Sequence, residues 1–252
     1  MILLTPFFNT SPRKANPVTI RIVYDNNQFN PQLKAEWGFS CFISGTQKTI
    51  LFDTGGNGST LLSNMKKLKI TPEQVDLIFL SHIHGDHTGG LLEFLKKNNK
   101  AKVFLPHLFP STFKKDIVAL DVQYIEVIEP IEICQDVFSS GELGTSIKEQ
   151  SLIIRTEKGL VIITGCAHPG IVDIVKKAKK LLNQNICLVL GGFHLLDSSK
   201  EAIEKVIYEF KKMGVKKVAP CHCSGKLCLN IFENKYGPGL IKFGISGEIK
   251  IK

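Results

Sequence analysis

The chain has 252 residues, of which 43% are hydrophobic and 22% charged, with a formal net charge of +9. This composition is typical of a globular protein with a large buried core and excludes a disordered or fibrous chain. The seven cysteines are an odd number in a chain too long to need disulfide staples, so we expect reduced thiols. No run approaches the roughly 18 apolar residues of a membrane span, and prolines interrupt the apolar patch in residues 1–17, which makes a poor signal peptide. We therefore expect a soluble, cytoplasmic protein without membrane contact.

The elements expected along the chain are strands interleaved with a few helices. Strand-like runs rich in Val, Ile, Leu and Phe occur at 18–24, 39–43, 49–52, 77–80, 102–105, 123–128, 151–156, 160–164, 186–190 and 217–220. Helical periodicity occurs at 58–67, 89–98, 171–182 and 200–213. Because several strands are nearly continuous apolar runs, we expect helices to cover the sheets on their outer faces. Since no linker, repeat or low-complexity tract divides the chain, we expect one domain over residues 1–252.

Residues 79–90 read FLSHIHGDHTGG and contain three of the seven histidines. The stretch follows the predicted strand 77–80, so we expect it on a loop at the carboxyl edge of a sheet, where ligands converge. His82 and His84 are two residues apart and could reach one ion, whereas Asp86 and His87 suit a second ion. Imidazole and carboxylate groups are preferred zinc ligands. The pattern predicts a metal site with one or two zinc ions, with iron or manganese as alternatives.

At this point the sequence resembles a known family. Residues 81–90, SHIHGDHTGG, resemble the HxHxDH signature of the metallo-β-lactamase superfamily. Upstream, TILFDTG resembles the superfamily's strand followed by Asp-Thr-Gly, which implies that Asp53 orients a metal-binding histidine. Downstream, VAPCHC resembles its last motif, which implies that His222 binds the second metal. The motifs occur in the family's order, and the resemblance implies an α/β fold, the four-layer αββα metallo-β-lactamase sandwich.

Two departures from the superfamily pattern occur in the second half of the chain. Residues 144–151, GTSIKEQS, lack the usual histidine, and Cys166 stands where a bridging aspartate is usual, with His168 two residues later. We infer that His168 supplies the third ligand of the first metal, and that Cys166 is either a thiolate ligand or a buried thiol beside the site. The ligand set that the resemblance implies is His82, His84 and His168 for the first metal and Asp86, His87 and His222 for the second.

The segments EQSL, KGLVIITGCAHPGIV, LGGFHL and CHCSG resemble a narrower subfamily labelled 7,8-dihydropterin-6-methyl-4-(β-D-ribofuranosyl)aminobenzene-5′-phosphate synthase, some members of which are known only as metal-dependent hydrolases. His194 follows a predicted strand and is interpreted either as a phosphate contact or proton donor, or as a hydrogen-bonded core residue. His107 has no partner by spacing and is expected on a loop. Trp37, the only tryptophan, is expected to pack at a strand start, with substrate stacking as the alternative.

The primary functional prediction is hydrolysis of an ester or phosphoester by a metal-activated water, with Asp86, His194 and Asp53 as catalytic residues. The subfamily label implies an alternative, a metal-assisted transferase that condenses a dihydropterin pyrophosphate with a phosphorylated ribofuranosyl-aminobenzene. A ribonuclease Z-like nuclease is a second alternative, although the bridging aspartate is missing. The basic charge suits an anionic small-molecule substrate, a phosphorylated one included, and no motif favours nucleic acid. The sequence leaves the oligomeric state unknown.

Overall fold

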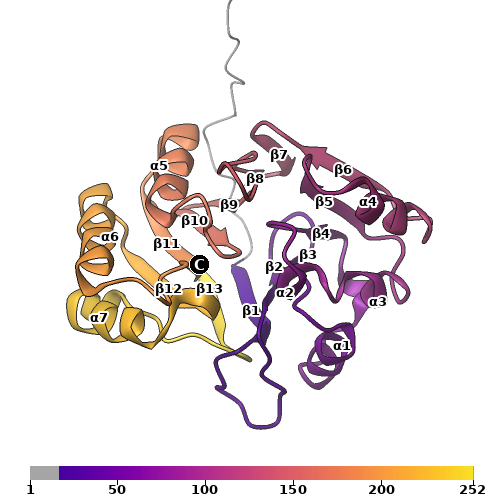
Figure 1. The fold of residues 1–252 in the computed structure, drawn as a ribbon, viewed down its shortest axis with the longest axis horizontal. Helices are drawn as coiled ribbons and strands as arrows, with labels where there is room; N and C mark the ends of the chain where they lie inside the picture. Colours follow the sequence, from indigo (N-terminus) through magenta and orange to yellow (C-terminus); the bar gives the residue numbers. More distant parts are fainter. Residues whose placement is uncertain (1–16, 252) are drawn as a thin grey trace, which may run out of the picture.

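Two β-sheets lie face to face at the centre of the molecule, and helices cover the outer face of each sheet (Figure 1). The structure, a computed structural model, describes residues 17–251. Its four layers of helix, sheet, sheet and helix confirm the predicted α/β sandwich. Nearly all of the apolar patch in residues 1–17 lies outside the described residues. Within residues 17–251, no helix is both long enough and apolar enough to cross a membrane.

The first sheet has seven strands and combines antiparallel and parallel pairs. Its spatial order is β13 (Glu248–Ile251), β1 (Val18–Asp25), β2 (Phe39–Ser44), β3 (Ile50–Phe52), β4 (Leu77–Phe79), β5 (Lys102–Pro106) and β6 (Tyr124–Val127). The strands from β3 to β6 are parallel to one another. The carboxyl ends of parallel strands share one edge of a sheet, so the segments that follow β3 and β4 emerge side by side.

The second sheet has six strands, and the three that come last in the chain are parallel to one another. Its spatial order is β12 (Lys217–Cys221), β11 (Ile186–Gly192), β10 (Gly159–Thr164), β9 (Leu152–Thr156), β8 (Val137–Ser139) and β7 (Ile131–Cys134). The strands β10, β11 and β12 are parallel neighbours. Three successive segments of the second half of the chain therefore emerge at one edge.

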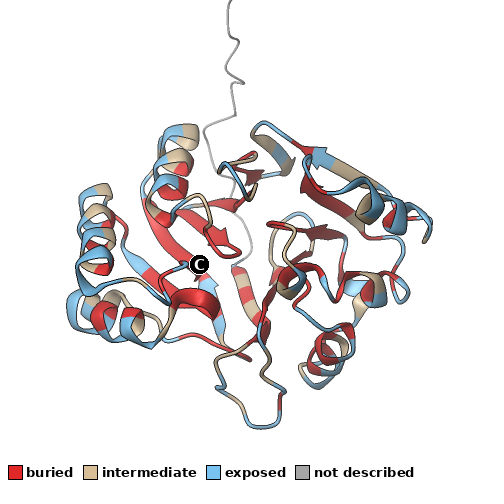
Figure 2. Cartoon of the chain, in the orientation of Figure 1, coloured by how far each residue is buried: buried red, intermediate tan, exposed pale blue. Residues whose placement is uncertain are grey.

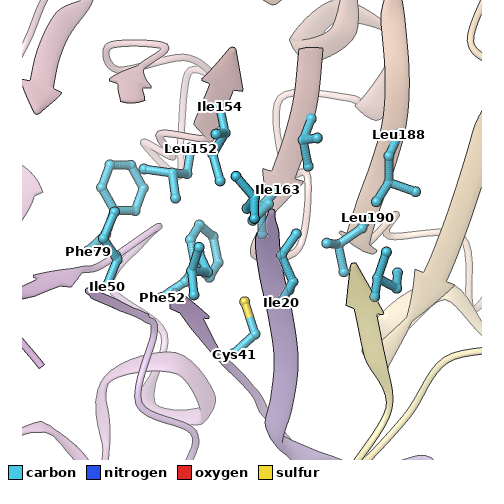
Figure 3. Close-up of a cluster of buried hydrophobic side chains, with 14 of the residues drawn as sticks. Ile20, Cys41, Ile50, Phe52, Phe79, Leu152, Ile154, Ile163, Leu188 and Leu190 are labelled. Carbon is cyan, nitrogen blue, oxygen red and sulfur yellow. The ribbon is translucent and has the colours of Figure 1, made fainter. Parts of the chain in front are cut away.

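The main core lies between the two sheets. Side chains such as Ile20, Phe52 and Phe79 from the first sheet face Ile163 and Leu190 from the second, and all five are at most 1% exposed (Figure 3). Burial of each such side chain stabilises the fold by roughly 1.5–3 kcal/mol relative to an exposed one. The interlocked faces hold the two sheets at a fixed separation, and this fixes the geometry of any site that both sheets build.

Seven α-helices and three short 3-10 helices complete the described chain. Beside the first sheet lie α1 (Gly58–Lys67), α2 (Gly85–Thr88), α3 (Leu91–Leu95) and α4 (Ser111–Val118); over the second lie α5 (Ile171–Leu182), α6 (Lys200–Met213) and α7 (Lys226–Tyr236). The 3-10 helices are η1 (Pro72–Gln74), η2 (His222–Ser224) and η3 (Gly237–Gly239). Figure 2 shows the larger helices with buried inner faces and exposed outer faces, as amphipathic helices on a sheet require.

Helix α6 shows how the sequence sets these boundaries. The Ser199 side chain accepts a hydrogen bond from the backbone N–H of Ala202 and caps the helix start. Ile203, Ile207 and Phe210, spaced by four and three residues, are its buried positions. The helix ends at Gly214, whose left-handed φ of 77° suits a residue without a side chain.

The structure confirms every predicted strand and most predicted helices, with shifts of a residue or two, and differs in two ways. The short strands β7, β8 and β13 and the helices α4 and α7 were not predicted. Of the helix predicted over 89–98 only α3 forms, and the unpredicted helix α2 precedes it, so the HxHxDH stretch is partly helical rather than a loop. Gly89 and Gly90 lie between α2 and α3, where the backbone approaches the loop after β3 so closely that a Cβ would lie 2.4 Å from the Gly56 oxygen and 2.2 Å from the Thr54 oxygen, respectively.

Candidate metal centre

The predicted metal-binding residues come together at the edge where the parallel strands of both sheets end. Each one lies within eight residues after the carboxyl end of its strand. The first sheet supplies Asp53 after β3 and His82, His84, Asp86 and His87 after β4. The second sheet supplies Cys166 and His168 after β10, His194 after β11 and His222 after β12. Residues as far apart in the chain as Asp53 and His222, which are separated by 169 positions, thus meet because two sheets of parallel strands end together.

Three imidazoles form the first donor group, His82, His84 and His168, whose ligand atoms all lie within 4.8 Å of one another. Nε2 of His82 is 3.2 Å from Nδ1 of His84. Nε2 of His168 is buried and has no hydrogen-bond partner within the described residues. An orphaned nitrogen of this kind costs about 1–3 kcal/mol unless something binds it. The group therefore fits a cation, and the structure brings together the three residues predicted for the first metal.

The second donor group is Asp86, His87, Cys166 and His222. Nε2 of His87 lies 3.3 Å from Nε2 of His222 and 3.2 Å from Sγ of Cys166. Oδ2 of Asp86 lies 3.2 Å from Nε2 of His222 and 3.6 Å from Nε2 of His87. Ligand atoms about 2.0–2.3 Å from a tetrahedral zinc lie about 3.3–3.8 Å from one another, so this spacing suits one four-coordinate ion. The structure adds Cys166 to the three residues predicted for the second metal.

The two donor groups are immediate neighbours. The ring of His82, from the first group, lies with its centroid 4.2 Å from that of His87, from the second. Two ions held in the two groups would therefore be close enough to act on one substrate atom. The aspartate that usually bridges the two ions in this arrangement is absent, and the Cys166 thiol occupies the second group only.

Asp53 fixes the orientation of one imidazole in each donor group. Its Oδ2 accepts hydrogen bonds from Nδ1 of His87 at 2.7 Å and from the hydroxyl of Ser81 at 2.7 Å. Because the Ser81 proton is committed to Asp53, its oxygen accepts from Nδ1 of His82, 2.9 Å away. Both imidazoles therefore carry their proton on Nδ1 and keep the lone pair of Nε2 free. Asp53 thus contacts the predicted ligands from behind, while its role in orienting them stays a prediction, and Ser81 is a relay that the sequence did not indicate.

His222 is held in the same way by Asn26, which comes directly after β1. Oδ1 of Asn26 accepts from Nδ1 of His222 at 2.8 Å, and Nδ2 of Asn26 donates to the backbone oxygen of His222 at 3.2 Å. The pair fixes both the ring and the backbone, whose φ of 49° is unusual for a residue with a side chain. Nothing in the local sequence around residue 26 indicates this role.

Glu149 organises the loop that carries Cys166 and His168. Its Oε1 accepts from the backbone N–H groups of Gly165, Cys166 and Ala167 at 3.1, 3.1 and 2.9 Å, and its Oε2 accepts from the N–H of His168 at 2.8 Å. Four consecutive N–H groups aimed at one carboxylate form an anion-binding loop. Glu149 lies in the segment where the usual histidine is missing, and it positions the residues that take over the ligand role.

Backbone strain is concentrated at this centre. Asp53, Ala167, His194 and His222 are non-glycine residues with φ between 49° and 64°. Left-handed conformations cost of order 1–3 kcal/mol each and persist only where surrounding contacts determine them. They turn the chain sharply after the ends of β3, β10, β11 and β12, so that Asp53, His194 and His222, and the Cys166 and His168 neighbours of Ala167, lie at the centre.

Burial and neighbouring charges set the protonation of the ligands. Burial holds the pKa of His82 well below its usual value and lowers the pKa of His168 to about 4. Both are therefore neutral near pH 7, as metal ligands must be. Burial, the largest single cause, lowers the pKa of His87, but the charge and hydrogen bond of Asp53 and the charges of Asp86 and Glu149 together raise it, so that the net shift is upward. Burial raises the pKa of Glu149 to about 7.

The remaining sequence-predicted residues lie at different distances from the centre. His194 is exposed, and its ring centroid is 4.4 Å from that of His168, which places it beside the first donor group. Trp37 lies two residues before the start of β2 and is 51% exposed; its ring packs against that of His222, 4.9 Å between centroids. His107 is exposed after β5 and pairs with Glu126.

The fold, the HxHxDH stretch and the paired donor groups define the class: the chain belongs to the metallo-β-lactamase superfamily. The model of that family matches residues 38–145. Among individual proteins, the chain is 35% identical to the 7,8-dihydropterin-6-methyl-4-(β-D-ribofuranosyl)-aminobenzene-5′-phosphate synthase of Methanocaldococcus jannaschii. That alignment covers 82% of this chain and 87% of the relative.

Solved structures agree on the fold. A protein described as a metal-dependent hydrolase of the β-lactamase superfamily is 29% identical, with a TM-score of 0.80 over 93% of this chain and 99% of its own. The short form of human tRNase Z has a TM-score of 0.64 over 93% of this chain and 99% of its own, at 13% identity, which shows the fold alone. These relatives place the chain among enzymes of this superfamily and leave hydrolysis and group transfer both open.

Proposed function

We propose that this chain is a metal-dependent hydrolase that cleaves an ester or phosphoester bond of an anionic small molecule. The observation that carries the proposal is the pair of adjacent donor groups, with the His82 and His87 rings 4.2 Å apart. Two ions bound there would bring the pKa of a shared water to about 7 and polarise the oxygen of the scissile bond. Three nitrogens in one group and an O, N, S, N set in the other favour zinc.

The protein's own residues have separable tasks in this reaction. Asp53 holds His82, through Ser81, and His87 in the tautomer that faces inward. Asp86 contributes the only carboxylate oxygen of the two donor groups, and its negative charge offsets part of the charge of the cations. A hydrogen bond with Cys223 raises the pKa of His194. An exposed imidazole of raised pKa beside the first donor group suits proton donation to the leaving group or contact with a phosphate.

The test is metal analysis combined with an activity panel. The native chain, the double variant His84→Ala/Asp86→Ala and the control His107→Ala are assayed on phosphomonoesters, phosphodiesters and lactones. The double variant removes one ligand from each group, so metal content and hydrolysis should fall together, whereas the exposed His107 should be dispensable. Hydrolysis by a metal-free double variant would contradict the proposal, as would a fully loaded native chain inactive on the whole panel.

A second candidate is condensation of a dihydropterin pyrophosphate with a phosphorylated ribofuranosyl-aminobenzene. Two observations favour it: the 35% identity to a synthase of that description, and the half-exposed Trp37 indole against His222, which offers a flat surface to a planar ring. The same donor groups would then assist departure of pyrophosphate. Incubation with both substrates, with mass spectrometry of the products, separates the two functions, because the synthase yields a condensed product and the hydrolase does not.

A further inference from the structure

A third cluster of metal-binding side chains lies beside the two donor groups. Its members are Cys166, His194 and Cys223, and their ligand atoms all lie within 4.8 Å of one another. We call these three residues the sulfur cluster. Each is the second residue after the end of its strand, since β10 ends at Thr164, β11 at Gly192 and β12 at Cys221. Three adjacent parallel strands thus deliver two thiols and one imidazole to one point.

The backbone makes room for the second thiol. Sγ of Cys223 lies 3.7 Å from the carbonyl oxygen of Cys166. A Cβ placed on Gly192 would come within 2.4 Å of the Gly165 oxygen and 2.6 Å of that sulfur, closer than real side chains approach. Only glycine therefore fits at residue 192 while the Cys223 thiol points toward Cys166.

The donors of the sulfur cluster differ in chemistry from those of the two donor groups. The first group is all nitrogen and the second has one sulfur among four donors, whereas this cluster has two sulfurs and one nitrogen. Thiolates and imidazole together select soft cations, and thiolate charge offsets the charge of the ion. Both thiols are only 4% exposed, but His194 is exposed, so the cluster opens to solvent on the imidazole side.

From this arrangement we propose that Cys166, His194 and Cys223 form a third metal site, one for a soft, thiophilic cation such as copper(I). The site shares Cys166 with the second donor group, so the Cys166 sulfur connects the two. The inference rests on the proposed metal centre only through that residue. A cation bound here would engage His194, the residue given proton donation or phosphate contact in the proposed function, so soft cations should lower the activity of the centre.

The test uses Cd²⁺ as the probe on the reduced, metal-free full chain. Bound ions are counted by elemental analysis after desalting, and near-ultraviolet absorption reports cadmium–sulfur bonds. The native chain should bind three ions. Cys223→Ser should bind two and lose most of the absorption, while Cys166→Ser should lose the sulfur cluster and weaken the second donor group. Cys228→Ser is the matched control, because this buried thiol of α7 belongs to none of the three sets and should leave three ions bound.

The outcomes distinguish failure of the third metal site from failure of the proposed hydrolase function. Two ions on the native chain, three on Cys223→Ser, or a loss in Cys228→Ser would overturn the sulfur-cluster site. If two ions are bound and His84→Ala removes one of them, the proposed function stands while the third site falls. Cadmium-113 NMR of the native chain needs no variant: one resonance with the shift of an ion bound by two sulfurs is expected, and its absence overturns the proposal.

Discussion

Replacement of Asp53 by Asn should disable both donor groups through a single side chain. In the native protein, Oδ2 of Asp53 accepts one hydrogen bond from Nδ1 of His87 and one from the hydroxyl of Ser81, both at 2.7 Å. An amide nitrogen in that place donates instead of accepting. His87 then accepts at Nδ1, and Ser81 accepts from the amide and donates to His82. Both imidazoles would carry their proton on Nε2, the atom that faces the cation.

The size of the effect follows from the number of imidazoles that change tautomer. Loss of a partner that orients a ligand typically costs 10–100-fold in metal affinity, or about 1.4–2.8 kcal/mol for each ion. The metal-free fold should change by less than about 1 kcal/mol, since each hydrogen bond is re-formed in the reverse direction. Asparagine also tolerates the left-handed backbone of residue 53, whose φ is 53°.

The assay is competition of each variant with a chelator for Zn²⁺, together with chemical denaturation of the metal-free proteins. Ser81→Ala breaks only the relay to His82 and should weaken the first donor group alone. Asp76→Asn, at the opposite end of β4, is the matched control and should bind both ions normally. If Asp53→Asn binds both ions within threefold of the native affinity, or if Ser81→Ala weakens both groups equally, the tautomer argument is refuted.

Three further predictions concern the loop, acidity and metal removal. Glu149→Ala leaves four backbone N–H groups without their acceptor and should lower the free energy of unfolding by about 3 kcal/mol or more, measured by denaturant titration against the exposed control Glu157→Ala. On acidification the second donor group should lose its ion before the first. The raised pKa of His87 lets protons displace the metal at higher pH, whereas the pKa of about 4 at His168 delays that displacement. Metal content measured against pH checks the order, and simultaneous loss of both ions contradicts it. Free Zn²⁺ at about 100 times its Kd should stabilise the folded protein by about 2.7 kcal/mol per ion. Removal of the ions with EDTA should therefore lower the Tm by at least about 5 °C in a chain of this size. An unchanged Tm would mean that the ions do not bind the folded state selectively.

The ligands could be predicted from the sequence because few residue types bind metals and their spacing is local. His82, His84, Asp86 and His87 lie within one hexad, and the structure brings all four to the centre. His168 was predicted from its position beside an altered motif, and it lies where the first donor group needs a third nitrogen. The part that Cys166 plays was left open, since spacing alone does not show where a thiol points.

The supporting residues could not be predicted because their roles depend on contacts between distant segments. Asn26 and His222 are 196 residues apart, and asparagine after a strand is ordinarily just a loop residue. Glu149 lies in a segment that lacks the usual histidine, and its role depends on the four backbone N–H groups of residues 165–168, which only the fold brings to it. The unpredicted strands β7 and β13 are four residues long and carry charged or polar residues among their apolar ones, so that their signal is weak.

The contact between Asn26 and His222 also dictates the order in which the centre assembles. A nascent chain that ends before β12 already contains every residue of the first donor group, but it lacks one ligand of the second. Contacts so distant in sequence form late, because the loop between them must close first. An ion bound early by His82, His84 and His168 would stabilise such an intermediate, and a second ion would bind only after β12 joins the second sheet and brings His222 to the centre.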